Sequence, residues 1–91
     1  MKYACPCCGY KTFDTEPCGS FNICPVCYWE DDPVQLKDPH YAGGGNKPSL
    51  VQAQRNFMEF GACELELKRH VRKPVAAEAR DEDWTPIDCA K

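Results

Sequence analysis

Two cysteine pairs with the same spacing stand in the first third of the chain, and they constrain its fold more than any other feature. The first pair lies in Cys5-Pro6-Cys7-Cys8-Gly9 and the second in Cys24-Pro25-Val26-Cys27, with residues 9–23 between them. A tight turn carrying Cys-x-x-Cys directs two thiolates toward one point, and two such turns facing each other complete a tetrahedron. The spacing therefore predicts a metal site with four thiolate ligands.

The first pair contains a third cysteine, so its ligands need an argument. Cys5 and Cys8 have the two-residue spacing, whereas Cys7 and Cys8 are adjacent, and neighbouring side chains seldom bend toward one metal. The predicted metal ligands are Cys5, Cys8, Cys24 and Cys27. Thiolates suit Zn²⁺ and also iron. A rubredoxin-like iron site is the main alternative because Tyr3 and Gly9-Tyr10 resemble a rubredoxin knuckle. The segment between the pairs is much shorter than in rubredoxins, which favours zinc.

A chain of this size would gain stability from a bound metal. A chain of 91 residues forms one small domain that buries only roughly 60–65% of its unfolded surface. The start has no apolar run typical of a signal peptide, and no run is long enough to span a membrane. We therefore expect a cytoplasmic protein, where eight cysteines indicate metal or redox chemistry rather than a secreted disulfide scaffold.

The charge pattern does not favour nucleic-acid binding. The formal net charge is −3, and four thiolates around a dication would lower it to about −5. Acidic runs occupy residues 30–32 and 81–83, and the basic run is confined to residues 68–73. A nucleic-acid binder needs a wider basic surface.

Sequence patterns divide the chain into four parts. Residues 1–29 predict a zinc-ribbon-like unit in which a hairpin, with strands at residues 10–13 and 21–23, joins the two cysteine turns. Residues 30–48 are rich in Asp, Pro and Gly and predict a polar loop. The last part is residues 62–91. Within it, residues 63–73 fit either a strand or a helix, and we prefer a helix that ends before Pro74. Residues 74–91 predict a tail anchored to the core by Trp84.

The main helix is expected at residues 49–61. Ser49 is a favourable N-cap and Gly61 a favourable stop. The apolar residues between them recur at helical spacing: Leu50, Ala53, Phe57 and Phe60. We expect this face to pack on the ribbon near Phe13, Phe21 and Trp29. The sequence thus predicts a single small α+β domain over residues 1–91, with N-terminal knuckles, one main helix and a packed C-terminal segment.

The remaining cysteines admit two interpretations. Cys7, Cys18, Cys63 and Cys89 can be small hydrophobic residues without a chemical role. Alternatively, Cys7 and Cys18 form a redox pair, or a second site together with His40.

The acidic segment Trp29-Glu30-Asp31-Asp32 also has more than one interpretation. Its carboxylates can cap the loop backbone. An aromatic residue beside three acids can form a presented binding surface. Paired carboxylates can also perform acid–base work in a small hydrolase, if they converge in a cleft with shifted pKa values.

Three stretches together resemble a known family. They are Cys5-Pro6-Cys7-Cys8-Gly9-Tyr10, residues 23–32, and Gly44-Gly45-Asn46 followed by Ser49-Leu50 and Asn56-Phe57. In combination they are similar to the bacterial cysteine-rich CPCC family over roughly residues 3–75. The resemblance implies a small zinc-binding bacterial protein. It implies no established activity, because the family is described by its cysteines and not by a reaction.

The function that the sequence favours is a structural zinc site supporting a protein-interaction module. A closed four-thiolate shell leaves the metal no open position for water or substrate, which argues against an enzyme. The alternatives are a thiol-redox protein or small hydrolase, using Cys7 and Cys18 or the carboxylates of Glu30, Asp31 and Asp32, and a rubredoxin-like iron protein.

Overall fold

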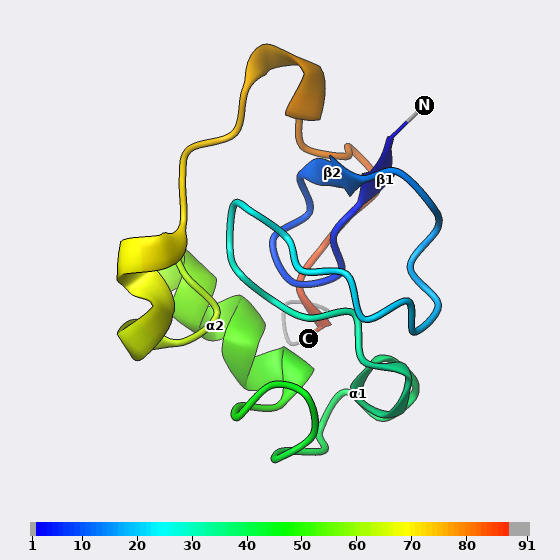
Figure 1. Cartoon of the computed structure of the whole chain (residues 1–91), viewed down its shortest axis with the longest axis vertical. Coiled ribbons are helices and arrows are strands. Elements are labelled where there is room, and N and C mark those ends of the chain that lie inside the picture. Colours follow the sequence, from blue (N-terminus) through cyan, green and yellow to red (C-terminus); the bar gives the residue numbers. More distant parts are fainter. Residues whose placement is uncertain (1, 88–91) are drawn as a thin grey trace.

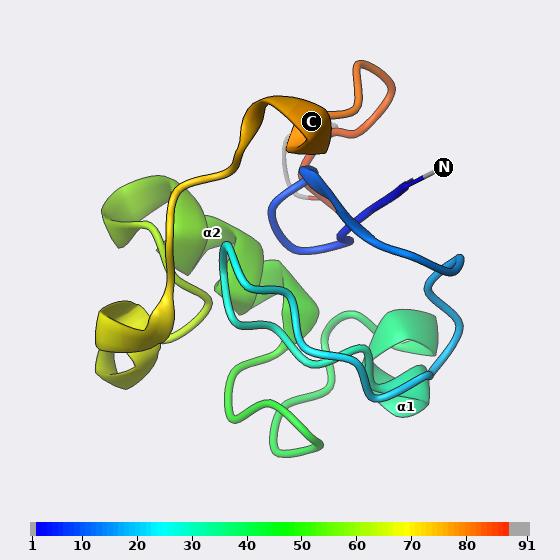
Figure 2. The same ribbon diagram turned by 45° about the horizontal axis from the view of Figure 1, so that its top comes forward.

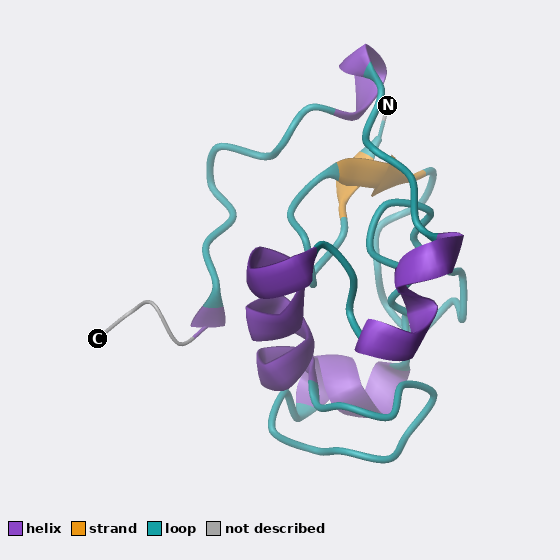
Figure 3. Ribbon diagram, turned by 90° about the vertical axis from the view of Figure 1, so that its left-hand side faces the viewer, coloured by secondary structure: helices purple, strands orange, loops and turns teal. Residues whose placement is uncertain are grey.

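The two strands of the protein lie together at one end, and helices and loops form the rest (Figures 1 and 3). A computed structural model describes residues 2–87. The elements are β1 (Tyr3–Ala4), β2 (Lys11–Phe13), α1 (Pro33–Lys37), α2 (Leu50–Phe60) and two 3-10 helices, η1 (Leu65–His70) and η2 (Ala76–Glu78). Cys89 and the end of the predicted tail lie outside the described residues. Within residues 2–87, no helix combines the length and the apolar character needed to cross a bilayer.

The β-hairpin encloses the first cysteine turn. The sequence had predicted that it would join the two turns, and this prediction is wrong. β1 and β2 pair antiparallel, with Tyr3 opposite Phe13 and Ala4 opposite Lys11. Residues 21–23 form no strand; Ile23 alone forms an isolated bridge, across the second cysteine turn. Phe21 has a φ of 64°, outside the extended range of a strand. Its side chain is 60% exposed, so the predicted packing of Phe21 under the helix is also wrong.

The segment predicted as a polar loop contains the short helix α1. The Asp32 side chain accepts a hydrogen bond from the Val34 N–H at 2.8 Å, and Pro33 stands in the first turn, where its missing N–H costs nothing. Gln35 is fully buried and holds the following loop by donating to the carbonyl oxygens of Tyr41 and Pro48 at 3.0 Å each. Five residues are too few to show a helical period, which is why the sequence did not reveal this helix.

The main helix α2 is confirmed, with the caps that the sequence predicted. The Ser49 hydroxyl accepts a hydrogen bond from the Gln52 N–H at 3.1 Å, and Gly61 ends the helix in the left-handed conformation. The predicted buried face of this helix was incomplete, because the face also includes Gln54, which is 3% exposed. Its side chain donates to the Pro6 carbonyl at 2.8 Å and accepts from the Ile87 N–H at 2.9 Å. Gln54 therefore fastens both the first cysteine turn and the tail to α2.

The second predicted helix is the 3-10 helix η1, which lies beside α2 (Figure 1). It ends before Pro74, as predicted, but it covers fewer residues than the predicted helix. None of its residues is buried. A helix without a buried face gains little from tertiary packing, which accounts for its short length.

The tail is anchored by Trp84, as predicted. The indole Nε1 donates to the Pro6 carbonyl at 2.9 Å. The Arg80 guanidinium lies 5.0 Å from the Tyr10 ring centre and 4.9 Å from that of Trp84, a distance at which cation–π attraction operates. Arg80 also donates to the Cys8 carbonyl at 3.0 Å. The tail therefore packs against the back of the first cysteine turn.

We expect Gly9→Ala to destabilise the fold far more than Gly43→Ala. Both glycines have positive φ values, of 81° and 86°, so alanine at either site costs about 1–2 kcal/mol of backbone strain. A Cβ at Gly9 would stand 2.6 Å from the Trp84 ring, whereas nothing lies within 4 Å at Gly43; the clash adds about 1–3 kcal/mol. Chemical denaturation of both variants gives the comparison, and equal losses would contradict the described contact.

Stability below neutral pH is expected to depend on Glu78. This side chain is 6% exposed, and its two oxygens accept hydrogen bonds from Arg72 at 2.8 Å each. The Arg72 guanidinium lowers the pKa of Glu78. The stabilisation is therefore complete above the unfolded-state pKa of about 4.3 and is lost as the pH falls from there through the folded-state pKa.

The measurement is the difference in unfolding free energy between the wild type and Glu78→Gln as a function of pH. The difference should be constant near neutral pH and shrink below about pH 5. Protonation of the cysteines affects both proteins and cancels. Glu16→Gln, which removes an exposed carboxylate that has no ion pair among residues 2–87, is the control and should show no such trend.

Candidate metal centre

The four cysteines that the sequence predicts as ligands lie together at the centre of the protein. Their sulfur atoms are all within 4.8 Å of one another, and all four side chains are buried. The sulfurs of Cys5 and Cys27 are 3.6 Å apart, and those of Cys8 and Cys24 are 3.8 Å apart. A tetrahedron with metal–sulfur bonds of about 2.3 Å has edges of about 3.8 Å. The cluster is therefore positioned to bind a metal ion.

The two cysteine turns have the same pattern of backbone hydrogen bonds. In the first, Gly9 donates to the Cys5 carbonyl at 2.8 Å and Cys5 donates to the Tyr10 carbonyl at 2.9 Å. In the second, the equivalent bonds run from Tyr28 to Cys24 at 2.7 Å and from Cys24 to Trp29 at 2.9 Å. The repeated Cys-Pro-x-Cys sequence thus forms one local structure twice, and its two copies face each other across the sulfurs.

Tyr28 takes the conformation that a glycine takes in the first turn. Its φ is 71°, against 81° for Gly9. A tyrosine in this left-handed region is strained by about 1–2 kcal/mol. Its ring stacks on that of His70, with centres 5.2 Å apart, which a glycine could not do. The strained backbone of Tyr28 is therefore accompanied by a stacking contact between its ring and η1.

The electrostatics of the cluster favour a bound cation. Hydrogen bonds from Cys27 and then from Cys5 and Cys8 lower the pKa of the Cys24 thiol far below its usual value. Burial raises the pKa of Cys5 and that of Cys27 well above the usual value. The cluster alone thus stabilises the Cys24 thiolate and opposes those of Cys5 and Cys27, and a bound cation would allow these thiols to ionise together.

Thr12 is a site residue that the sequence analysis did not identify. Its hydroxyl donates to the Cys24 sulfur at 3.1 Å, and the Val26 N–H approaches the same sulfur at 3.4 Å. Such bonds stabilise a thiolate and orient it. The available signal was the position of Thr12 in the strand that leaves the first turn.

The remaining cysteines do not form the predicted redox pair. Cys7 is buried in the core, whereas Cys18 is exposed on the surface. Burial raises the pKa of the Cys7 thiol, the opposite of what a reactive thiol requires. Cys63 is also buried, and burial raises the pKa of its thiol. Among residues 2–87 no second cluster of three or more metal-binding side chains forms, so the alternative of a second site with His40 is not realised.

The acidic segment after the second turn holds the backbone. Oδ2 of Asp31 accepts hydrogen bonds from the N–H groups of Cys18, Gly19 and Ser20 at 3.0–3.1 Å and from the Ser20 hydroxyl at 2.9 Å. Asp32 accepts from Gly45 and Val34, and the Gly45 N–H lowers the pKa of Asp32. The interpretation as loop caps is therefore confirmed for both carboxylates.

The structure forms neither an exposed Trp29 surface nor a catalytic pair of Asp31 and Asp32. Trp29 is 0% exposed, so it cannot present an aromatic binding surface. Asp31 and Asp32 are buried and bound to backbone N–H groups, which leaves them unavailable as a catalytic pair for a hydrolase.

Comparison with known proteins agrees with the site. The family model described as "Cysteine-rich CPCC" matches residues 3–78, a range that contains all four clustered cysteines. No curated protein sequence matches the chain.

Serine substitutions are expected to divide the cysteines into two groups. Replacement of any one of Cys5, Cys8, Cys24 and Cys27 should release the metal and unfold the domain, because a structural zinc contributes on the order of 10 kcal/mol or more. Cys7→Ser is the matched control in the same turn. It should keep the metal and cost about 1–3 kcal/mol for the buried hydroxyl.

Metal content per chain and thermal unfolding of each variant give the answer. Cys18→Ser, at an exposed position, should change neither. Metal release by Cys7→Ser together with metal retention by Cys8→Ser would assign a different set of ligands.

Proposed function

Since the chain belongs to the cysteine-rich CPCC family, we propose that its four-cysteine cluster holds one Zn²⁺ as a structural ion. Cys5, Cys8, Cys24 and Cys27 are the ligands. The two facing turns then form a zinc site between two knuckles, without the joining hairpin that the sequence predicted, and the domain built on this site serves as a protein-interaction module in the cytoplasm.

The observation that carries the proposal is the closed and buried set of four sulfurs. All four cysteine side chains are fully buried, so a metal held by them has no side open to water. Catalytic zinc sites keep one position free for water or substrate, whereas structural sites are closed by four protein ligands. The shape of the cluster therefore supports a structural role over a catalytic one.

Zinc is preferred to iron for two reasons. Zinc commonly occupies closed tetrahedral four-thiolate sites in small domains. The segment between the two turns is short, unlike that of a rubredoxin. The sulfur separations of 3.6 and 3.8 Å suit either metal, so the choice between them is made by experiment.

The second turn connects the metal site with the C-terminal half of the domain. The Cys63 N–H donates to the Cys27 carbonyl at 2.8 Å, and the Arg72 N–H donates to the Pro25 carbonyl at 3.1 Å. An ion that fixes this turn also fixes the segments on either side of η1. This arrangement supports a role for the metal in shaping a surface at some distance from itself.

Two further features support an interaction role in a reducing compartment. The described cysteines are all free thiols, as expected where disulfides do not persist. The carboxylates of Asp31 and Asp32 hold loop backbone, and the Cys7 thiol is buried. Two of the three carboxylates and one of the two thiols that an enzyme would use are thus engaged in the structure.

The purified protein is expected to contain one zinc ion per chain and to unfold when a strong chelator removes it. The reason is that the metal supplies on the order of 10 kcal/mol or more to a small domain. Elemental analysis gives the identity of the metal, and circular dichroism before and after chelation gives the fold.

Re-addition of Zn²⁺ should restore the spectrum, which serves as the control for irreversible damage. A protein that remains folded without metal would refute the structural role. A protein that holds iron, with the visible absorption of an iron–thiolate centre, would replace zinc and leave the four ligands in place.

A further inference from the structure

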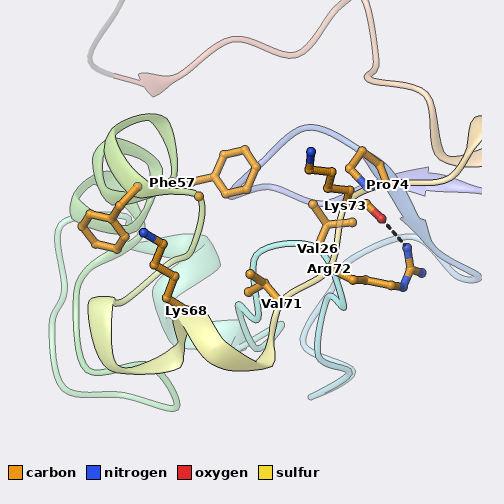
Figure 4. A pocket seen from close by; sticks show the side chains of 9 residues that line it. Val26, Phe57, Lys68, Val71, Arg72, Lys73 and Pro74 are labelled. Carbon is orange, nitrogen blue, oxygen red and sulfur yellow. Dashed lines mark hydrogen bonds between the residues drawn. The ribbon is translucent and has the colours of Figure 1, made fainter.

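A groove with an apolar floor and a basic rim lies beside the second cysteine turn (Figure 4). Its volume is about 310 Å³. The residues that line it come from the second turn, from the end of α2 and from the segment that follows η1: Val26, Phe57, Phe60, Gly61, Lys68, Val71, Arg72, Lys73 and Pro74. This set is called the basic groove below.

The basic groove is attached to the metal centre by direct contacts. Val26, between the ligands Cys24 and Cys27, forms part of the floor. The Arg72 N–H donates to the neighbouring Pro25 carbonyl at 3.1 Å, which fixes the far wall to the same turn. The His70 ring stacks on Tyr28 of this turn. The floor and wall are therefore held by rigid structure, as an interaction site requires.

Within the described part of the chain, the positive charge of the rim is neutralised at Arg72 and remains free at Lys68 and Lys73. Arg72 is held by Glu78 through two hydrogen bonds of 2.8 Å. Neither Lys68 nor Lys73 forms an ion pair with any residue between 2 and 87. Figure 4 shows their amines on two different sides of the hollow, whose lining includes Val26 and Val71. Two free ammonium groups thus frame an apolar floor.

We propose that the basic groove binds an acidic segment of a partner protein, which places one hydrophobic side chain on the floor and its carboxylates at Lys68 and Lys73. This inference rests on the proposed interaction role and names the chemistry of the partner. Charge complementarity at a rim steers and orients such an encounter, and burial of an apolar side chain supplies affinity.

Two observations favour an acidic peptide over a larger anionic surface. A volume of about 310 Å³ is at the lower end of ligand pockets and suits one or two side chains. The net charge of the whole chain is −3, so a nucleic acid or an anionic bilayer would be repelled by most of the protein. A short peptide touches only the groove and avoids that repulsion.

The test begins with a library of random dodecapeptides displayed on phage and selected on the zinc-loaded protein. The selected peptides are expected to carry a Leu, Phe or Trp flanked by Asp and Glu. One selected peptide is then labelled with fluorescein and titrated with the protein, and its affinity is measured by fluorescence anisotropy at two salt concentrations.

Three groove variants and one matched control follow. Lys68→Glu, Lys73→Glu and Val71→Ser should each weaken binding about tenfold. Lys37→Glu makes the same charge reversal in α1, on the opposite side of the molecule from η1 (Figure 2), and should change affinity less than about twofold. Zinc content is measured for every variant, so that a loss of binding is not a loss of fold.

The proposal is overturned if the selected peptides lack acidic residues, or if they bind Lys68→Glu and Lys73→Glu as tightly as the wild type. It is also overturned if a single-stranded DNA dodecamer or phosphatidylserine vesicles bind in place of the peptides and lose binding in the same variants. Failure of these tests with one zinc per chain still present leaves the structural metal intact. Peptide binding by a folded, metal-free protein would instead refute the structural zinc and keep the groove.

Discussion

The gathering of four thiols in one buried cluster is the constraint on which the rest of this structure depends. Six of the largest fully buried side chains are cysteines, and the buried aliphatic side chains are few, chiefly Val26, Leu50 and Val51. A hydrophobic core of this size stabilises a small domain only weakly. The cluster brings together two turns that are far apart in sequence, and it can do so at full strength only when a cation compensates four desolvated thiolates. A metal bound at this cluster would thus supply stability that larger domains obtain from a larger hydrophobic core.

Buried polar side chains hold the loops in place through hydrogen bonds, as the sulfur cluster holds the two cysteine turns together. Oδ2 of Asp31 collects three backbone N–H groups from residues 18–20, and the Gln35 amide bonds to both the carbonyl and the N–H of Asn46 at 3.0 Å. Asn46 in turn accepts from the Glu30 N–H at 2.8 Å and donates to the Glu30 carbonyl at 2.9 Å. These side chains satisfy backbone groups that a sheet would otherwise pair. Long segments without regular secondary structure are therefore ordered, at the cost of acidic and amide residues that resemble functional ones in sequence.

The parts of the structure that were predictable are those coded by local spacing. The two Cys-x-x-Cys turns could be predicted from their own residues, together with the requirement that their sulfurs meet at one point. The helix α2 was indicated by Ser49, Gly61 and the helical spacing of its apolar residues. What the sequence did not reveal depends on contacts between distant residues. The pattern of residues 10–13 predicted a strand that overlaps β2, but its partner was assigned to residues 21–23 and not to β1. The role of Asp31 as a loop cap could not be separated from surface or catalytic roles, because its partners lie 11–13 residues away. The basic groove likewise exists only where Val26, α2 and the segment after η1 meet.

The groove and the four-cysteine cluster share one turn, and this has a thermodynamic consequence for a metal bound at the cluster. Pro25 and Val26 lie between two of the clustered cysteines, and they also receive Arg72 and form the groove floor. If the second turn loses its shape when the metal leaves, then the state that binds a partner is the metal-bound state. Linkage is reciprocal, so a partner that binds only this state must also increase the affinity of the cluster for its metal. The size of the coupling is set by how much of the groove survives without the ion, which depends on the contacts that do not pass through the turn, above all those of Phe57 and of the Arg72–Glu78 pair. A domain with so small a hydrophobic core has few such contacts, so if the proposed metal and partner both bind, the coupling between them is strong.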